Sequence, residues 1–393
     1  MKEAKTSLRV LQLNSLLTGG GTDDRSVRIA HAVHRLGHCV LMVGPPGREF
    51  TQVAQQLGLA FVPSTTGPLK LKLIINTARL VRSHQIQIVH ARHGRDYWPA
   101  VFAARLSGAQ PRVVLSRHLA KSPSSWVSRR YLLNYCDAML AASQFVVKVL
   151  REGHADPASD NPERHYRPPM RGDLSKIHVV YGGIDMTRFR PDDGTSQRVA
   201  WGIDPSQFVF AVVGSYDFPR GKGQPEFLEA AARVRSALPQ ARFLIIGRGN
   251  MHLALEGQIR QLQLQDVARL TGWCTDMPAV MNAIDCLVLP AVGTEAIPGV
   301  VLEAHACGKP VIASDLDGIP EAFNAGGYGQ LVRPGSIDEL AAAMLAWAKK
   351  PPIDLAGRWQ LHEKVAAQFS LERAAERLVA VYKSLVAPSA AQA

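Results

Sequence analysis

The chain has 393 residues, of which 47% are hydrophobic and 20% are charged. This length and composition predict a globular protein with room for two domains, and they exclude a disordered chain. The sequence has no run of eighteen apolar residues, and its start, MKEAKTSLRVLQLN, has no signal-peptide core, so we expect no membrane span and a cytoplasmic protein. The five cysteines are scattered without C-x-x-C spacing, which favours reduced thiols over a zinc site.

Charge is distributed unevenly along the chain. Residues 1–195 contain 27 Lys and Arg against 14 Asp and Glu, a net charge of +13, whereas the remainder contains 18 against 19, a net charge of −1. The first half is therefore expected to meet an anionic partner, such as a membrane surface, a phosphorylated substrate or nucleic acid. A basic face that serves only solubility is the alternative.

The first elements form a strand–loop–helix–strand unit. Residues 8–14 read as a buried parallel strand, residues 27–36 as a helix and residues 39–43 as the next strand. The loop between strand and helix contains three glycines, Gly19, Gly20 and Gly21, which would allow a ligand to approach the backbone closely. It lacks the G-x-G-x-x-G pattern, and Asp23 and Asp24 would weaken its attraction for an anion. A tight structural turn and a ligand cradle both remain open.

The same alternation continues through two series of elements. The first series has strands at 86–90, 112–116, 138–142 and 176–181 and helices at 69–83, 98–107, 125–135 and 144–153. The second has strands at 208–213, 243–246, 268–270, 286–289 and 329–332 and helices at 224–236, 251–262, 277–284, 319–324, 336–349 and 372–387.

This order predicts an α/β fold of two Rossmann-like, doubly wound domains that face each other across a cleft. We assign residues 1–190 to the first domain and 191–370 to the second. Residues 371–393 are expected to form a C-terminal helix that packs back toward the first domain, followed by a loose tail. Ligands of such sheets bind beyond the carboxyl ends of the strands.

The stretch 292–315, VGTEAIPGVVLEAHACGKPVIASD, carries the most specific local pattern. It predicts a loop to about Ile297, a helix from about Pro298 to Cys307 and a strand from Pro310. Glu295 then lies in the loop and Glu303 in the second helical turn, on either side of the free N–H groups at the helix N-terminus. This arrangement suits a phosphate-bearing ligand. Two solvated glutamates on an ordinary amphipathic helix are the alternative.

Together these stretches resemble the retaining glycosyltransferases of family 4, which have the GT-B fold. The resemblance covers residues 8–385 and rests on four motifs in order: GGGTDDRSVRIAHAVHRLGHCVLMV, VVYGGIDMTRFRP, the loop ending in GKG, and the E-x₇-E motif of Glu295 and Glu303. It implies a metal-independent hexosyltransferase that moves a sugar from a nucleotide diphosphate sugar to an acceptor hydroxyl with retention of configuration. It implies no cofactor, so the D-x-D of Asp315 and Asp317 is expected to be an ordinary loop.

The resemblance also implies roles for individual residues on the donor side. Lys222 and the N–H groups of Gly299, Val300 and Val301 would stabilise the diphosphate, Glu303 would hold the ribose, and Glu295 would meet the transferred sugar. Gly249, Trp273 and Cys274 would lie near the base. The family usually has an arginine where this chain has Ser215, and Arg220 is our hypothesis for the replacing cation.

On the acceptor side, His118 resembles the family histidine that faces the donor sugar and the reaction centre. Gly20 and Gly21 would lie against the diphosphate and the sugar. The implied catalytic residues are thus His118, Lys222 and Glu295. The basic first half would hold an anionic glycan or lipid-linked acceptor, in contact with the inner face of the membrane and without nucleic acid. Assembly of lipopolysaccharide core or exopolysaccharide from a UDP-sugar is the expected setting.

Two other classes of protein compete with this interpretation. A dinucleotide-dependent oxidoreductase would need the G-x-G-x-x-G turn after the first strand, and this chain has G-G-G-T. A catalytically inactive nucleotide-sugar-binding or nucleic-acid-binding protein would be consistent with the basic half, but the chain has no recognisable RNA-binding motif, and it retains Lys222, Glu295 and Glu303.

Overall fold

The computed structural model describes residues 7–17, 21–47, 49–64, 70–155, 166–219 and 221–387. The chain divides into two compact units. Unit 1 comprises residues 1–154, 167–183 and 370–393, and unit 2 comprises residues 155–166 and 184–369. Among the described residues, no helix is both long and apolar enough to cross a membrane.

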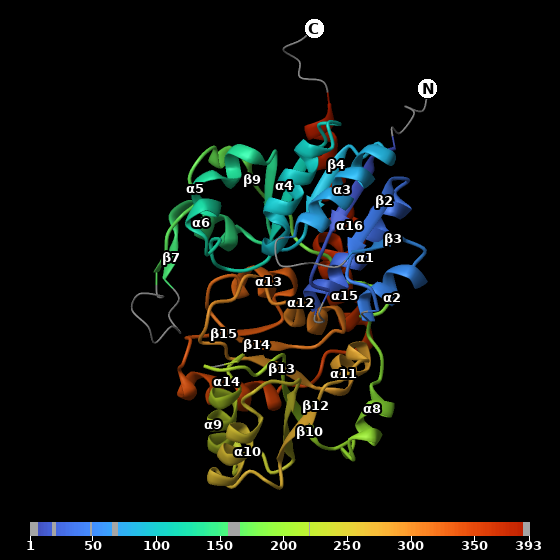
Figure 1. Ribbon diagram of the computed structural model, residues 1–393. Coiled ribbons are helices and arrows are strands. Elements are labelled where there is room, and N and C mark those ends of the chain that lie inside the picture. Colours follow the sequence, from blue (N-terminus) through green and yellow to red (C-terminus); the bar gives the residue numbers. More distant parts are fainter. Residues whose placement is uncertain are drawn as a thin grey trace. The chain divides into compact units, whose positions relative to one another are not determined.

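Unit 1 is built on a seven-stranded parallel sheet with the strand order β3-β2-β1-β4-β5-β6-β9 (Figure 1). Its strands are β1 (Arg9–Leu13), β2 (Cys39–Gly44), β3 (Ala60–Pro63), β4 (Ile88–Ala91), β5 (Arg112–Arg117), β6 (Ala138–Ala141) and β9 (Ile177–Val179). Its helices are α1 (Gly21–Arg35), α2 (Glu49–Gln56), α3 (Leu71–Ser83), α4 (Tyr97–Leu106), α5 (Trp126–Tyr135), α6 (Gln144–Glu152) and α16 (Leu371–Val386), with 3₁₀ turns η1 (Gly94–Asp96) and η2 (Leu174–Lys176). A two-residue ladder pairs β7 (His154–Ala155) with β8 (Tyr166–Arg167).

Unit 2 is built on a six-stranded parallel sheet with the order β12-β11-β10-β13-β14-β15. Its strands are β10 (Phe208–Val213), β11 (Ala241–Ile246), β12 (Ala268–Gly272), β13 (Cys286–Leu289), β14 (Val311–Ser314) and β15 (Gly329–Val332). Its helices are α8 (Thr195–Ala200), α9 (Gln224–Val234), α10 (His252–Gln261), α11 (Met277–Ala283), α12 (Gly299–Ala306), α13 (Ile319–Gly326), α14 (Ile337–Ala348) and α15 (Leu355–Phe369).

Helices pack on both sheets, and inner strands such as β10 and β13 are continuous apolar runs, as expected for strands buried on two faces. In unit 2, Phe210 on β10 stacks on Phe243 of β11, and Phe227 of α9 packs edge-on against Phe243. All three rings are fully buried. The two-domain α/β class predicted from the sequence is confirmed.

The C-terminal helix α16 belongs to the core of unit 1. It packs against α1, and its Leu378 and Tyr382 are almost fully buried. The hydroxyl of Tyr382 is hydrogen-bonded to Nδ1 of His90 at 2.6 Å, and Nε2 of the same ring is hydrogen-bonded to the Ser116 hydroxyl at 2.7 Å. Burial lowers the pKa of His90 well below its usual range, so the ring is neutral and can donate one of these bonds and accept the other.

Several sequence expectations about the elements need correction. The segment GTDD, predicted as loop, forms the first turn of α1, where Asp23 and Asp24 are favourable beside the positive end of the helix dipole. Helix α12 begins at Gly299, because Pro298 is its N-cap with an extended ψ of 114°. Strand β5 continues to Arg117. Three α-helices and three strands were not predicted, namely α2, α8, α15, β3, β7 and β8.

A buried histidine predicts acid sensitivity of unit 2. His305 on α12 is fully buried and donates its Nε2 proton to the carbonyl of Tyr328 at 3.0 Å, and burial lowers its pKa to about 4. Because the folded pKa lies below the unfolded value, the unfolded state takes up the proton first and stability falls as the pH drops below about 6.5. Through this single group, the free energy of unfolding should fall by about 2 kcal/mol between pH 7.5 and pH 5.

The measurement is urea unfolding of the chain and of its His305→Gln variant at pH 7.5 and pH 5. Over this interval, the free energy of unfolding of the variant is expected to fall by about 2 kcal/mol less than that of the unaltered chain. An exposed residue of unit 2 without a titratable group supplies the control, since Gln240→Asn should leave the pH dependence unchanged. Equal pH dependence in the unaltered chain and the His305 variant would contradict the assignment.

Candidate active site

The predicted donor-side residues gather at one edge of the unit 2 sheet. Because all six strands are parallel, the segments that follow them emerge at their common carboxyl edge. The strand order reverses between β10 and β13, and such a switch point is where open α/β sheets bind ligands. The predicted residues follow β10, β11, β12 and β13 directly, at positions 215, 222, 249, 273, 274 and 295.

Two of these residues form an ion pair that the sequence did not predict. The ammonium of Lys222 contacts Oε1 of Glu295, and the two side chains are 31% and 10% exposed. The lysine stem lies across Gly214, where an added Cβ would be 3.0 Å from its Cγ. The carbonyl of Glu295 accepts a hydrogen bond from the N–H of Gly318 at 3.0 Å. The structure thus brings the loops after β10, β13 and β14 together around one ammonium–carboxylate pair.

Gln224, the first residue of α9, was missed from the sequence and holds the lysine loop in place. It is fully buried. Its Oε1 accepts the N–H of Lys222 at 2.7 Å, and its Nε2 donates to the carbonyl of Ser215 at 3.3 Å. One amide side chain therefore ties both ends of the loop. A polar residue directly after the G-K-G segment was the only signal in the sequence.

The loops after β10, β11 and β12 lie against one another through close backbone contacts. A Cβ on Gly249 would lie 2.3 Å from the carbonyl oxygen of Tyr216, so this position has room only for glycine. The N–H of Tyr216 donates to the carbonyl of Arg248 at 3.2 Å. The Arg248 guanidinium lies 4.6 Å from the ring centroid of Trp273, which is 48% exposed, and Cys274 beside it is partly buried. Arg248 was not among the predicted residues.

The N-terminus of α12 offers two of the three predicted amides. The N–H of Val301 donates to the carbonyl of Pro298 at 3.3 Å, so it is already used within the first turn. Within the described part of the chain, the N–H groups of Gly299 and Val300 have no recorded partner, which leaves them able to bind an anion. Glu303, in the second turn of the same helix, is partly buried.

His118 follows β5 at the carboxyl edge of the unit 1 sheet. Its Nε2 is buried and has no hydrogen-bond partner among the residues described. Burial, reinforced by the charges of Arg92 and Arg25, lowers the pKa of His118 well below its usual range. A neutral imidazole with an unused ring nitrogen can donate to or accept from a ligand hydroxyl.

Two further charged residues of this edge were missed. Arg92 is buried and donates through Nε to the Ser26 hydroxyl at 3.1 Å. Asp96 is fully buried, accepts the N–H of Ser15 at 2.8 Å through Oδ2, and has no recorded partner for Oδ1 among the described residues. Burial raises the pKa of Asp96. The motif RHGRD directly after strand β4 could have signalled both.

Some predicted residues are not placed by the structure. Gly20 and Arg220 lie outside the described residues, and Gly21 is the first residue described in α1. The described ranges contain no group of three or more His, Cys, Asp or Glu side chains that could hold a metal ion. Asp315 donates its N–H to the carbonyl of Val332 at 2.7 Å in the loop after β14.

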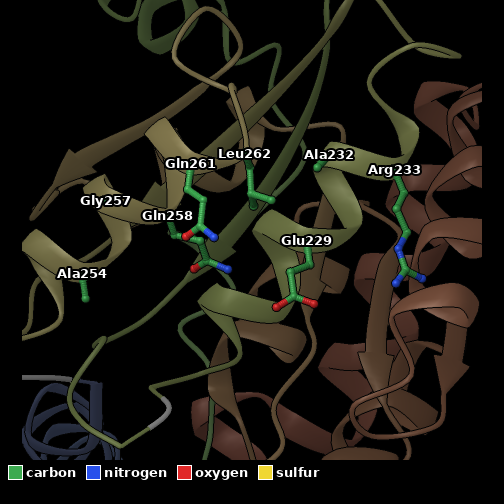
Figure 2. A pocket seen from close by; sticks show the side chains of 8 residues that line it. All are labelled: Glu229, Ala232, Arg233, Ala254, Gly257, Gln258, Gln261 and Leu262. Carbon is green, nitrogen blue, oxygen red and sulfur yellow. The ribbon is translucent and has the colours of Figure 1, made fainter.

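A shallow surface hollow of unit 2 contains none of the predicted residues. It lies between α9 and α10, and Figure 2 shows the side chains of Glu229, Gln258 and Gln261 around it. The amide of Gln258 is used in a hydrogen bond to the carbonyl of Pro225 at 3.1 Å. We assign no function to this hollow.

Comparison with known proteins identifies the family. Residues 19–160 match the family described as "Glycosyltransferase Family 4", and residues 207–350 match "Glycosyl transferases group 1". The chain therefore belongs to the family 4 glycosyltransferases, as the E-x₇-E resemblance predicted.

Individual relatives are more distant. The chain is 33% identical to a "D-inositol 3-phosphate glycosyltransferase" of Segniliparus rotundus over 56% of this chain and 49% of that protein. It is 24% identical to the "Lipopolysaccharide core biosynthesis mannosyltransferase LpsB" of Rhizobium meliloti over 88% of this chain and 93% of that protein. The aligned segments span only 49 to 64% of the lengths of three inositol-phosphate relatives.

Solved structures support the fold. The structure titled "Crystal structure of Anabaena Alr3699/HepE in complex with UDP and glucose" matches with a TM-score of 0.78 at 20% identity, covering 96% of this chain and 100% of that one. The two parallel sheets of this chain thus have the GT-B fold.

Proposed function

We propose that this protein is a retaining hexosyltransferase that moves a sugar from a nucleotide diphosphate sugar to an acceptor hydroxyl. The observation that carries the proposal is the Lys222–Glu295 pair at the carboxyl edge of the unit 2 sheet. A cation and a carboxylate beside free helix amides match a donor that has an anionic diphosphate next to a hydroxyl-rich sugar.

Each group at this edge has a role in the proposed reaction. Departure of the nucleoside diphosphate places negative charge on its oxygens, and preorganised donors lower the barrier by stabilising that charge. Lys222 would release Glu295 and bind the diphosphate together with the amides of Gly299 and Val300. The freed Glu295 would accept hydrogen bonds from the hydroxyls of the transferred sugar, and Glu303 would accept those of the ribose. No metal ion takes part in this scheme.

The loops near Trp273 would meet the base of the donor. Gly249 keeps the backbone close to Tyr216, and the Arg248 guanidinium lies over the Trp273 ring. We propose uracil as the base, since HepE, a structure with the same fold, is described with UDP and glucose. Backbone carbonyl and N–H groups of these loops would form hydrogen bonds with the base.

Unit 1 would bind the acceptor. We propose an anionic or lipid-linked glycan in the assembly of lipopolysaccharide core or exopolysaccharide. The net charge of +13 in residues 1–195 favours such an acceptor and contact with an anionic inner membrane face. LpsB is described as a lipopolysaccharide core mannosyltransferase. The neutral His118 would hydrogen-bond the transferred sugar.

The first test is a thermal-shift and calorimetry screen of UDP-, GDP- and ADP-sugars. A donor supplied at a hundred times its Kd should stabilise the protein by about 2.7 kcal/mol. We expect UDP-sugars to give the largest shift, with and without magnesium. If none of the three nucleotides binds under either condition, the proposal fails.

Glu303 supplies a sharper prediction about the ribose. Replacing Glu303 by alanine should weaken binding of UDP about tenfold or more, since a charged acceptor of two hydroxyl hydrogen bonds is lost. Calorimetric titration with UDP measures this directly. Glu363→Ala, an exposed glutamate of α15, is the control and should leave the affinity unchanged. Unchanged affinity in Glu303→Ala would place the ribose elsewhere.

A further inference from the structure

The segment of unit 1 that contains α3, α4 and α5 is rich in basic residues and has no exposed acidic residue. Helices α3, α4 and α5 pack side by side, whereas α1 packs against α16 (Figure 1). Residues 70–135, which contain these three helices, include twelve Lys and Arg, of which Arg92 and Arg117 are buried, and a single acidic residue, Asp96. Asp96 is fully buried, so its carboxylate does not offset the charge of this surface.

The same helices leave large apolar side chains exposed. Phe102 and Leu106 of α4 are 49% and 61% exposed, and Trp126 and Tyr131 of α5 are 64% and 36% exposed. Together with Arg105 and Arg130 they define what we call the α4–α5 face. Apolar side chains that gather on a surface indicate contact with a partner.

Ring contacts join the two helices of this face. Phe102 stacks on Trp98 with the ring centroids 5.6 Å apart, and Trp98 meets Tyr135 of α5 at 5.8 Å. The guanidinium of Arg105 lies 4.2 Å from the centroid of Tyr135. At the start of α5, Trp126 contacts Tyr131 edge-on at 5.9 Å. The exposed rings are therefore held in place by neighbours rather than loosely attached.

We propose that the α4–α5 face docks unit 1 on the surface of an anionic lipid bilayer. Trp and Tyr side chains favour the headgroup region, because their rings are apolar while their N–H or O–H group can stay hydrated there. Phe102 and Leu106 would enter the acyl boundary, and Arg105 and Arg130 would meet the anionic headgroups. This names the partner of unit 1 in the proposed function, but the inference rests on the unit 1 surface alone.

A single-stranded nucleic acid fits this face less well. Base stacking needs free ring faces, and Arg105 already covers one face of Tyr135. Exposed aliphatic side chains such as Leu106 and Leu71 of the neighbouring α3 contribute little to phosphate or base recognition, whereas they favour insertion among lipids.

The test is flotation of the full chain with vesicles of phosphatidylcholine alone and with 30% phosphatidylglycerol, at about 50 and 500 mM salt. We expect binding to the anionic vesicles that weakens at high salt. The apolar variant Phe102→Ser, Leu106→Ser, Trp126→Ser and the charge variant Arg105→Gln, Arg130→Gln should each weaken binding about tenfold or more. The matched control is Val199→Ser, Leu253→Ser in unit 2, whose two side chains are 72% and 78% exposed and which should bind like the unaltered chain.

A spectroscopic readout locates the contact. Brominated lipids should quench part of the tryptophan fluorescence, and Trp126→Phe should remove much of that quenching while keeping the flotation. Failure of the unaltered chain to float on anionic vesicles would overturn the proposal, as would equal binding of all variants. Binding of poly(U) that both face variants abolish, with flotation unaffected, would identify nucleic acid as the occupant instead.

Circular dichroism and calorimetric titration with UDP accompany every variant. Unchanged spectra and UDP affinity would show that a loss of flotation is not a loss of folding or of the donor site. A protein that floats but binds no nucleotide would sustain the docking face and reject the proposed function, so the two failures are distinguishable.

Discussion

Replacing Lys222 by alanine is expected to lower kcat/KM for sugar transfer about a hundred- to a thousandfold. The variant loses the cation that would stabilise the leaving diphosphate. It also leaves Glu295, whose side chain is 10% exposed, without the ammonium that pairs with it. An uncompensated carboxylate beside the diphosphate repels it, so donor binding and turnover should both fall.

A double variant separates these two effects. If repulsion by Glu295 contributes to the loss, Lys222→Ala combined with Glu295→Gln should bind UDP more tightly than Lys222→Ala alone, while turnover stays low. Steady-state kinetics and calorimetry measure the two quantities. Lys349→Ala, an exposed lysine at the end of α14, is the control. Full turnover in Lys222→Ala would show that the diphosphate binds elsewhere.

Replacing Gly223 by alanine should destabilise unit 2 by about 3 kcal/mol or more and weaken UDP binding. Gly223 precedes α9 with φ +85°, and an added Cβ would lie 2.1 Å from the carbonyl oxygen of Pro290. That contact joins the lysine loop to the segment that carries Glu295. Relief of the clash must separate the two partners of the ion pair, so stability and donor binding are expected to fall together.

A substitution at Gly202 measures separately how much stability is lost when a residue other than glycine adopts the left-handed conformation. Gly202 has φ +63°, and a Cβ there would meet nothing within 4 Å. Gly202→Ala should therefore cost only the left-handed conformation, about 1 kcal/mol. Urea unfolding of both variants gives the difference, which is the cost of the clash. Similar losses for the two variants would mean that the loop at Gly223 yields without strain.

The fold was predictable because its dominant signals are local. Strands β10 and β13 are unbroken apolar runs between polar loops, and both were predicted with the bounds that the structure has. Helix α15 was missed for the opposite reason. Only four of its residues are buried, and it packs mainly on α12 and α13, so its stability comes from tertiary packing that a local pattern does not reveal.

The donor-side residues were predictable one at a time, but their pairing was not. Lys222 and Glu295 are 73 residues apart in the sequence, and only the parallel order of β10 and β13 brings their loops together. Gln224 bonds only backbone groups, the N–H of Lys222 and the carbonyl of Ser215. Every residue type except proline has these groups, so the neighbouring sequence gives no sign of the contact. Arg92 and Asp96 were passed over since buried charges have no periodic pattern.

The position of α16 in unit 1 has a consequence for biosynthesis. Residues 184–369 form the continuous part of unit 2 and leave the ribosome before α16 does. Unit 1, by contrast, has Tyr382 in its core, hydrogen-bonded to His90. Although domains usually fold in the order of synthesis, the earlier half of this chain stays incomplete until its last helix emerges. The apolar surface of α1 that packs against α16 therefore lacks its native cover while unit 2 is translated.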